Sequence, residues 1–240
     1  MDYFEHYKRV NDLSEKGRRS HWKPFDKTLG RFLPRSREAV IVDVGCGAGI
    51  LLEWLQEKGY RNASGIDLDR GQIGFCEELG LPAEQVVDSA KWLEDHRGID
   101  FLILKDVLEH VPEEQVRILL LAAKRSLSVG GKIYISVPNA LSSFATLWRY
   151  IDGTHLRSYS ENVMRLELVR AGFHVQAVLD DDTWAVSSFS GIVRLVLRTL
   201  FRCFRRLEAV GEFGSEGLRT PLGLNLIVVA APANEQTAGR

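Results

Sequence analysis

Short apolar runs alternate with longer amphipathic runs between residues 39 and 230 of this 240-residue chain. The short runs are rich in β-branched and aromatic residues, which is typical of strands, and the longer runs have helical periodicity. Strands that alternate with helices form a doubly wound, mostly parallel sheet with helices on both faces, so we predict an α/β fold. The seven predicted strands are Ala39–Val44, Ala63–Ile66, Gln85–Val87, Phe101–Leu104, Lys132–Val137, Val175–Leu179 and Leu224–Ala230.

Three of the intervening helices have recognisable ends. Ile50–Lys58 follows a glycine loop, Glu113–Ser126 begins with acidic residues and ends with basic ones, and Asn162–Ala171 ends at Gly172. Acidic residues in the first turn and basic residues in the last suit the helix dipole, and glycine commonly ends a helix. We predict that the glycines at 130–131 end the second of these helices and that the next strand starts beyond them.

The same pattern divides the chain into parts. Residues 1–38 are polar and basic with scattered aromatics, and we expect a helical cap over the edge of the sheet. Residues 39–231 form the main domain, with an amphipathic insert at about 187–210. The small, polar residues 232–240 are predicted to be a disordered tail.

The insert has arginines at helical spacing, namely Arg194, Arg198, Arg202 and Arg205, among apolar residues. A basic amphipathic helix is a candidate for peripheral contact with an anionic membrane, or for binding an acidic acceptor. A third interpretation is an insert whose apolar face packs on the sheet or on a second subunit while its arginines are solvated. We favour the third, because most amphipathic helices bury their apolar face in their own protein.

Composition narrows the functional classes. A net charge of -1 argues against a nucleic-acid partner, and no apolar run is long enough to span a membrane. The cysteines Cys46, Cys76 and Cys203 are far apart, which argues against a disulfide framework and for a reducing compartment. We expect a cytoplasmic protein, with the inner membrane surface as the place where the basic insert would bind.

A glycine-rich loop follows the first predicted strand and opens a helix. Its glycines are Gly45, Gly47 and Gly49, in the pattern G-x-G-x-G, and Asp43 precedes them. Glycine lets the backbone approach a ligand closely, and the helix N-terminus offers free N–H groups. An acid at Asp43 would repel a pyrophosphate but suits the ammonium group of an amino acid.

Two more acids follow later strands. Asp67 ends the second strand, where a carboxylate can accept hydrogen bonds from both hydroxyls of a ribose, and Asp88 follows the third, where it can meet the amine of an adenine. In this order and spacing, the three signals resemble class I S-adenosylmethionine-dependent methyltransferases. The resemblance implies S-adenosylmethionine as the cofactor and a last strand that is antiparallel at an inner position. The candidate cofactor residues are Asp43, Gly45, Cys46, Gly47, Gly49, Asp67, Leu68, Asp88, Ser89 and Lys105.

The segment after the fourth strand contains D-x-x-E-H, made by Asp106, Glu109 and His110. The core Leu-Glu-His-Val at 108–111 is similar to that of ubiquinone-type O-methyltransferases and related glycan enzymes, in which the matching positions can hold a divalent metal. Three neighbouring ligands rarely complete a metal site, so we favour a structural turn and predict no metal.

The run Gly-Thr-His-Leu-Arg at 153–157 also resembles those enzymes. A hydroxyl acceptor must lose its proton as it attacks, and histidine suits that role near neutral pH. His155 is our first candidate for the base and His110 the second. The alternative is that His155 only orders the loop or contacts the acceptor.

The sequence therefore favours an S-adenosylmethionine-dependent methyltransferase, acting on the oxygen of a small-molecule, glycan or lipid-linked acceptor. A non-catalytic regulatory module that binds the same cofactor is the alternative. The spacing of the glycines and the acid at Asp43 argue against an NAD-dependent oxidoreductase. A nucleic-acid methyltransferase is disfavoured because the Asn-Pro-Pro-aromatic motif is absent after the fourth strand.

Overall fold

The computed structural model describes residues 3–181 and 189–233. Among these residues, seven strands form one sheet in the order β3-β2-β1-β4-β5-β7-β6. β7 lies antiparallel between β5 and β6, and the other neighbours pair in parallel. The predicted doubly wound sheet and its inner antiparallel last strand are confirmed. The strands are β1 (Ile41–Val44), β2 (Ala63–Asp67), β3 (Ala83–Gln85), β4 (Ile99–Lys105), β5 (Leu127–Pro138), β6 (Phe173–Asp180) and β7 (Asn225–Pro232).

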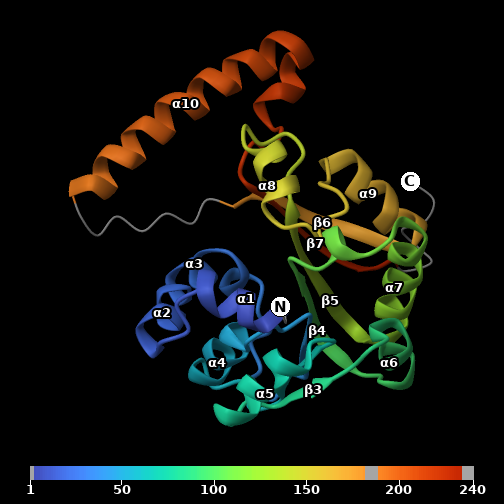
Figure 1. Cartoon of the computed structure of the whole chain (residues 1–240). Helices are drawn as coiled ribbons and strands as arrows, with labels where there is room; N and C mark the ends of the chain where they lie inside the picture. Colours follow the sequence, from blue (N-terminus) through green and yellow to red (C-terminus); the bar gives the residue numbers. More distant parts are fainter. Residues whose placement is uncertain (1–2, 182–188, 234–240) are drawn as a thin grey trace.

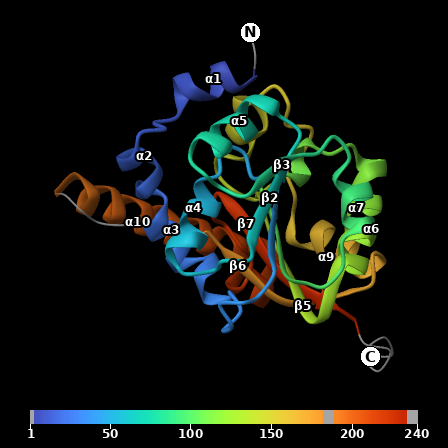
Figure 2. The same cartoon turned by 90° about the horizontal axis from the view of Figure 1, so that it is seen from below.

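Helices cover both faces of the sheet (Figures 1 and 2). Side chains of a strand alternate between its two faces, so Leu102 and Leu104 of β4 enter one core while Phe101 and Ile103 enter the other. The first core is closed by α6, α7 and α9, and the second by α4 and α5. These helices are α4 (Ile50–Glu57), α5 (Arg70–Glu78), α6 (Ser89–Asp95), α7 (Glu113–Ser126) and α9 (Glu161–Arg170).

The predicted bounds of β3 and β5 were wrong, and the ends of several other strands differ from the prediction by one or two residues. β3 ends at Gln85, where the Val86 amide completes the parallel ladder by donating to the Asp67 carbonyl at 2.8 Å, and Val87 is exposed. β5 begins at Leu127, before the two glycines that were expected to precede it. The ladder with β4 is irregular there, and Gly130 has a φ of 82°, so these glycines bend the strand instead of preceding it.

The N-terminal segment folds into α1 (Tyr3–Val10), α2 (Glu15–Ser20) and α3 (Trp22–Lys27). These helices rest on α4 and α5. Aromatic contacts explain this position: Phe25 meets Trp54 of α4 at 5.6 Å between ring centroids, and Phe4 meets Phe75 of α5 at 5.9 Å.

Two further helices precede and follow β6. α8 (Ala145–Ile151) lies between β5 and α9, and α10 (Phe189–Phe213) extends away from the body of the molecule (Figure 1). No helix in the described ranges is long and apolar enough to cross a membrane. The start of the predicted insert, at 187–188, and most of the predicted disordered tail, 234–240, lie outside the described residues. β7 continues to Pro232, beyond the predicted start of that tail.

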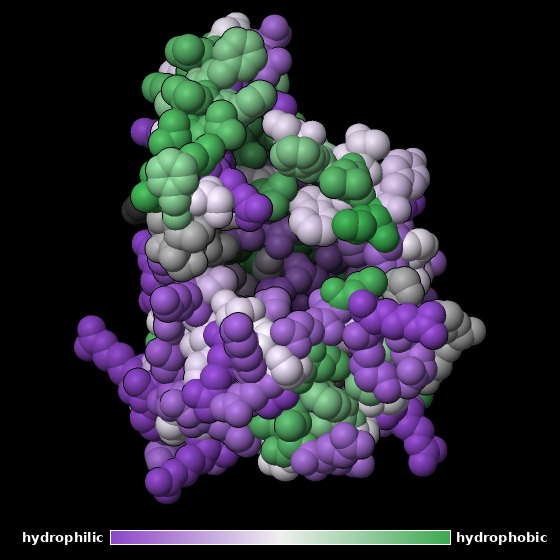
Figure 3. Space-filling view, turned by 60° about the vertical axis from the view of Figure 1, so that its left-hand side comes forward, coloured by the Kyte–Doolittle hydropathy of each residue, from purple (hydrophilic) through white to green (hydrophobic). Residues whose placement is uncertain are grey.

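The polar face of α10 points toward the protein. Arg198 donates to the Asp181 carbonyl at 3.2 Å, and Arg205 donates to the Ser143 hydroxyl at 3.0 Å. The opposite face is apolar and exposed, and Figure 3 shows hydrophobic side chains gathered over this helix. The interpretation that the sequence favoured is therefore wrong where it placed the apolar face on the sheet and these arginines in solvent.

Candidate functional site

The glycine loop joins β1 to α4 at the carboxyl edge of the sheet. Gly45 and Gly47 have φ angles of 73° and 56°, in the left-handed region that favours glycine. A Cβ atom at Gly45 would lie 2.6 Å from Cγ2 of Val107, so a larger residue does not fit. The amides of Gly45 and Cys46 donate to the Ile66 carbonyl at 2.8 and 3.1 Å, which fastens the loop to β2.

Asp67 at the end of β2 holds the same loop with its side chain. Its Oδ2 accepts from the Gly47 amide at 2.8 Å, and its Oδ1 accepts from the Asp69 amide at 2.9 Å. These bonds fix the carboxylate in one orientation. Because each carboxylate oxygen has two lone pairs, both can still accept a hydrogen bond from a ligand.

Asp43 is the most deeply buried acid of this loop, with 2% of its surface exposed. Burial raises the pKa of Asp43 to about 8, Lys105 opposes that rise, and Asp67 and Asp106 add to it. A carboxyl group in this environment is protonated near neutral pH unless a cation binds beside it. The loop therefore has the chemistry of a site for a positively charged ligand.

β4 ends beside this loop with Lys105, which forms an ion pair with the next residue, Asp106. Asp106 has a φ of 57°, an uncommon value for a residue other than glycine, and its amide donates to the Ser136 carbonyl at 2.8 Å. Backbone strain of this kind concentrates at functional sites.

Tyr7 of α1 also lies at this site, although no sequence motif marks it. Burial raises the pKa of Tyr7, and the charged groups that act on it are Lys105, Asp106 and Asp67. The N-terminal helices, which pack on α5 through α1, thus extend over the carboxyl edge of the sheet. The only sequence signal was the aromatic character of this segment.

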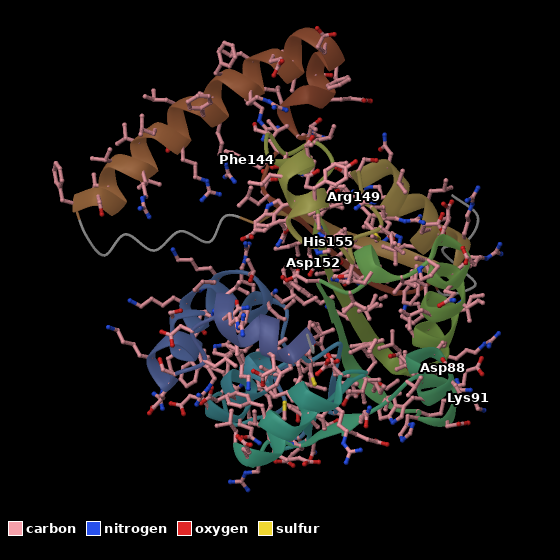
Figure 4. The ribbon with its side chains drawn as sticks, in the orientation of Figure 1. Asp88, Lys91, Phe144, Arg149, Asp152 and His155 are labelled. Atoms are coloured by element: carbon pink, nitrogen blue, oxygen red, sulfur yellow. The ribbon has the colours of Figure 1, made fainter. Side chains whose placement is uncertain are left out.

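His110 and His155 lie against each other, with ring centroids 4.7 Å apart. His155 Nδ1 is 2.7 Å from the Trp148 carbonyl, which can only accept, so that nitrogen carries the proton. Thr154 Oγ1 donates to Asp152 Oδ1 at 2.6 Å and therefore accepts from His110 Nδ1 at 2.9 Å. In the neutral form of each ring, Nε2 is therefore the nitrogen without a proton. Figure 4 shows Asp152 and His155 together below α8.

The loop that carries His155 is fastened to the turn that carries His110. The Leu156 amide donates to the Glu109 carbonyl at 2.7 Å, and the Tyr159 hydroxyl donates to the Leu108 carbonyl at 3.0 Å. Burial lowers the pKa of His110, and His155 lowers it further. His110 is therefore neutral near neutral pH. Together, His110 and His155 can accept a proton.

Glu109, His110 and His155 bring potential metal-ligand atoms within 4.8 Å of one another. Asp106, a predicted candidate, does not belong to this group because it pairs with Lys105. Burial raises the pKa of Glu109 to about 8, with a further rise from Asp106. Both histidine Nδ1 atoms are already hydrogen-bonded, so the group offers three ligand atoms, one of them on a carboxyl that burial keeps protonated.

We expect removal of divalent metal to leave activity within about twofold of the untreated enzyme, because three ligands do not complete a typical site. Dialysis against a chelator, followed by an assay with and without added Mg²⁺ or Mn²⁺, measures this. Loss of activity that either ion restores would contradict the expectation.

The remaining predicted cofactor residues lie further out along the same edge. Asp88 is exposed and caps α6 by accepting from the Lys91 amide at 2.9 Å, and Ser89 is the first residue of that helix. Leu68, after β2, is also exposed. In Figure 4, Asp88 and Lys91 lie well away from His155. Asp43, the glycines, Asp67 and Lys105 are thus brought together, with Asp88 on the outer rim.

The sheet order, the glycine loop and the buried acid behind it define a class I S-adenosylmethionine-dependent methyltransferase fold. The chain belongs to the methyltransferase domain family, whose model matches residues 17–178. The cofactor of this class is S-adenosylmethionine, and the residues present fit it. A buried carboxyl suits its cationic amino-acid end, and the glycines let the loop pack closely against Val107 and Gln72.

Curated relatives match part of the chain. The ubiquinone biosynthesis O-methyltransferase of Methylococcus capsulatus is 36% identical over 104 residues, which cover 41% of this chain and 43% of that protein. The enzyme of the same name from Colwellia psychrerythraea is 30% identical over 130 residues, covering 48% and 52%. The match therefore spans about half the length of these relatives or less.

Solved structures match nearly the whole chain at low identity. A SAM-dependent methyltransferase from Archaeoglobus fulgidus superposes with a TM-score of 0.66 at 20% identity, covering 95% of this chain and 99% of that one. An S-adenosylmethionine-dependent methyltransferase from Mesorhizobium loti gives 0.56 at 19% identity, covering 86% and 97%. These likenesses establish the fold.

Proposed function

We propose that this protein transfers a methyl group from S-adenosylmethionine to a hydroxyl oxygen of a small-molecule acceptor. One observation carries the proposal: the cation site at Asp43 and the histidine pair, His110 and His155, lie at the same carboxyl edge of the sheet. When bound, S-adenosylmethionine supplies an electrophilic methyl carbon on a sulfonium centre. The protein must then position the acceptor and remove its proton.

The residues of the glycine loop bind the cofactor in this proposal. The Asp43 carboxylate receives the ammonium group, and the backbone at Gly45, Cys46, Gly47 and Gly49 lines the amino-acid end. Lys105 neutralises the acids that crowd this end, since its charge acts on Asp43. Asp67 receives the ribose hydroxyls, and Leu68, Asp88 and Ser89 border the adenine.

The acceptor side depends on His155. Its Nδ1 proton is held by the Trp148 carbonyl, which leaves Nε2 to take the proton of the acceptor hydroxyl. His110 is the second candidate, held in the same tautomer by Thr154. The names of the curated relatives favour a phenolic acceptor, and a glycan or lipid-linked hydroxyl is the other class we consider. Three free cysteines suit a cytoplasmic setting.

Transfer of tritium from methyl-labelled S-adenosylmethionine to a catechol tests the proposal. We expect a labelled methyl ether whose formation requires the wild-type protein and is inhibited by S-adenosylhomocysteine. A panel that also contains a glycan and an amine identifies the chemical class of the acceptor. Label that goes to nitrogen would contradict oxygen transfer. Tight cofactor binding with no label on any hydroxyl would support the regulatory module instead.

Cofactor binding should become stronger as pH rises toward 8. Burial raises the pKa of Asp43 to about 8, so at lower pH the ligand-free carboxyl is protonated and must lose its proton to bind an ammonium. We expect affinity for S-adenosylhomocysteine to rise more than about tenfold between roughly pH 6.5 and pH 8.5. Calorimetry in two buffers with different ionisation enthalpies should also detect proton release on binding below pH 8. Affinity that does not change with pH, with no proton release, would count against this role of Asp43.

A further inference from the structure

Gln72 lies in the first turn of α5, which begins at Arg70 shortly after β2 ends at Asp67. Asp69 caps this helix, because its Oδ1 accepts from the Gln72 amide at 2.8 Å. A glutamine at this position commonly turns its side chain back to accept from the amide of the capping residue. Here the Asp69 amide donates to Asp67 Oδ1 at 2.9 Å instead. The cap of α5 therefore makes no use of the Gln72 side chain.

The Gln72 side chain extends to the glycine loop. It is buried, with 5% of the residue exposed, and its Oε1 lies 2.8 Å from the point that a Cβ atom at Gly47 would occupy. Gly47 has a φ of 56° and no side chain, so the loop leaves this space to the amide group of Gln72. A residue of α5 that no sequence motif marks is thus in contact with the cofactor loop.

The Oε1 atom of Gln72 is buried without a hydrogen-bond partner among the residues that the structure describes. Most buried side-chain polar atoms in proteins have a partner, because a buried acceptor without one has lost its hydrogen bonds to water. A ligand that donates a hydrogen bond to Oε1 would restore what burial removes. This unpartnered oxygen beside the glycine loop therefore points to a donor on the cofactor.

Asp67 indicates which part of the cofactor supplies that donor. Its Oδ2 accepts from the Gly47 amide at 2.8 Å, so Asp67 and Gln72 both contact the same glycine. In the site proposed above, Asp67 lies at the ribose, whose two hydroxyls bring two protons. Both Asp67 oxygens already accept from a backbone amide, whereas Gln72 Oε1 accepts from no described residue. Gln72 can therefore take one of the two hydroxyl protons.

We propose that Gln72 is a further cofactor-binding residue, whose Oε1 accepts a hydrogen bond from one ribose hydroxyl of S-adenosylmethionine while the other hydroxyl donates to Asp67. Gln72 touches the cofactor but moves no proton and forms no bond in methyl transfer, so its role is to position the ribose against the glycine loop. The inference rests on the cofactor site proposed above, and it does not depend on the identity of the acceptor.

Gln72→Met tests the proposal, because methionine has a similar length but no amide group. We expect titration calorimetry to show that the variant binds S-adenosylhomocysteine at least about tenfold more weakly than the wild type. The Tm of the ligand-free variant should be unchanged or higher, since Oε1 has no described partner to lose. A purely structural role would instead lower Tm.

Two analogues of S-adenosylhomocysteine, one without the 2′-hydroxyl and one without the 3′-hydroxyl, identify the contact. For the analogue that lacks the partner of Gln72, wild type and Gln72→Met should bind within about twofold of each other, because neither complex can form the hydrogen bond. For the other analogue, the variant should again bind at least about tenfold more weakly. Equal loss of affinity for all three ligands would overturn the proposed hydrogen bond.

Gln56→Met is the matched control, since Gln56 is an exposed glutamine on α4, and it should bind all three ligands as the wild type does. Wild-type affinity for S-adenosylhomocysteine in Gln72→Met would overturn the proposal. These measurements need no acceptor. Normal cofactor binding without methyl transfer to any hydroxyl would therefore contradict the proposed function alone, whereas a wild-type protein that does not bind S-adenosylhomocysteine would overturn both.

Discussion

Asp43→Asn is expected to weaken binding of S-adenosylhomocysteine at least about 30-fold, because an ammonium group loses its charged partner in a buried site. Asparagine has nearly the same shape as aspartate but no charge. Its amide hydrogens would face the hydrogens of the ligand's ammonium group. Titration calorimetry at roughly pH 8.5 measures the change, since the wild-type carboxyl is mostly ionised above its pKa of about 8.

A measurement of thermal stability distinguishes loss of the ammonium partner in Asp43→Asn from misfolding. Burial disfavours the charged form of Asp43, so removal of its charge should leave Tm unchanged or raise it slightly. Asp95→Asn is the matched control, because Asp95 is exposed on α6, where it forms an ion pair with Lys91 at 3.4 Å. We expect the control to bind as the wild type does. Full affinity in Asp43→Asn would show that the ammonium is held elsewhere.

His155→Ala is expected to lower kcat at least about tenfold, with a much smaller change in KM, because the acceptor loses the base that takes its proton. Affinity for S-adenosylhomocysteine should not change, since His155 lies among residues of the acceptor side. Steady-state kinetics with the acceptor identified by the labelling assay, together with calorimetry, measure these quantities.

Two further variants test whether the loss of kcat is specific to His155. His174→Ala removes an exposed histidine on β6, outside the site, and should leave kcat unchanged. His110→Ala should cost less than His155→Ala, since His110 is the second candidate. A loss confined to KM in His155→Ala would make it a binding residue, and a larger loss of kcat in His110→Ala would reverse the two roles.

The sheet and the cofactor loop were predictable because their signals are local. Residues of β4 are buried on both faces and give an uninterrupted apolar run, and the spacing of Gly45, Gly47 and Gly49 appears within a few residues of the acid at Asp43. The short strand β3 was misplaced, because its position depends on the pairing of Ala83–Gln85 with β2, which only the folded chain brings together.

The histidine network and the orientation of α10 depend on contacts that are distant in sequence. His110 meets Thr154 across 44 residues, so the sequence could nominate both histidines but not the tautomer that Thr154 imposes. Periodicity located both faces of α10, but it carries no information about which face meets the protein. That choice follows from contacts such as Arg205 with Ser143, 62 residues earlier.

A crystal structure of this protein with S-adenosylhomocysteine is the most direct test of the cofactor site. We expect the ligand's ammonium group within hydrogen-bond distance of the Asp43 carboxylate, its ribose hydroxyls at Asp67, and its sulfur facing the space beside His110 and His155. A ligand bound with its amino-acid end away from Asp43, or outside the glycine loop altogether, would contradict this expectation.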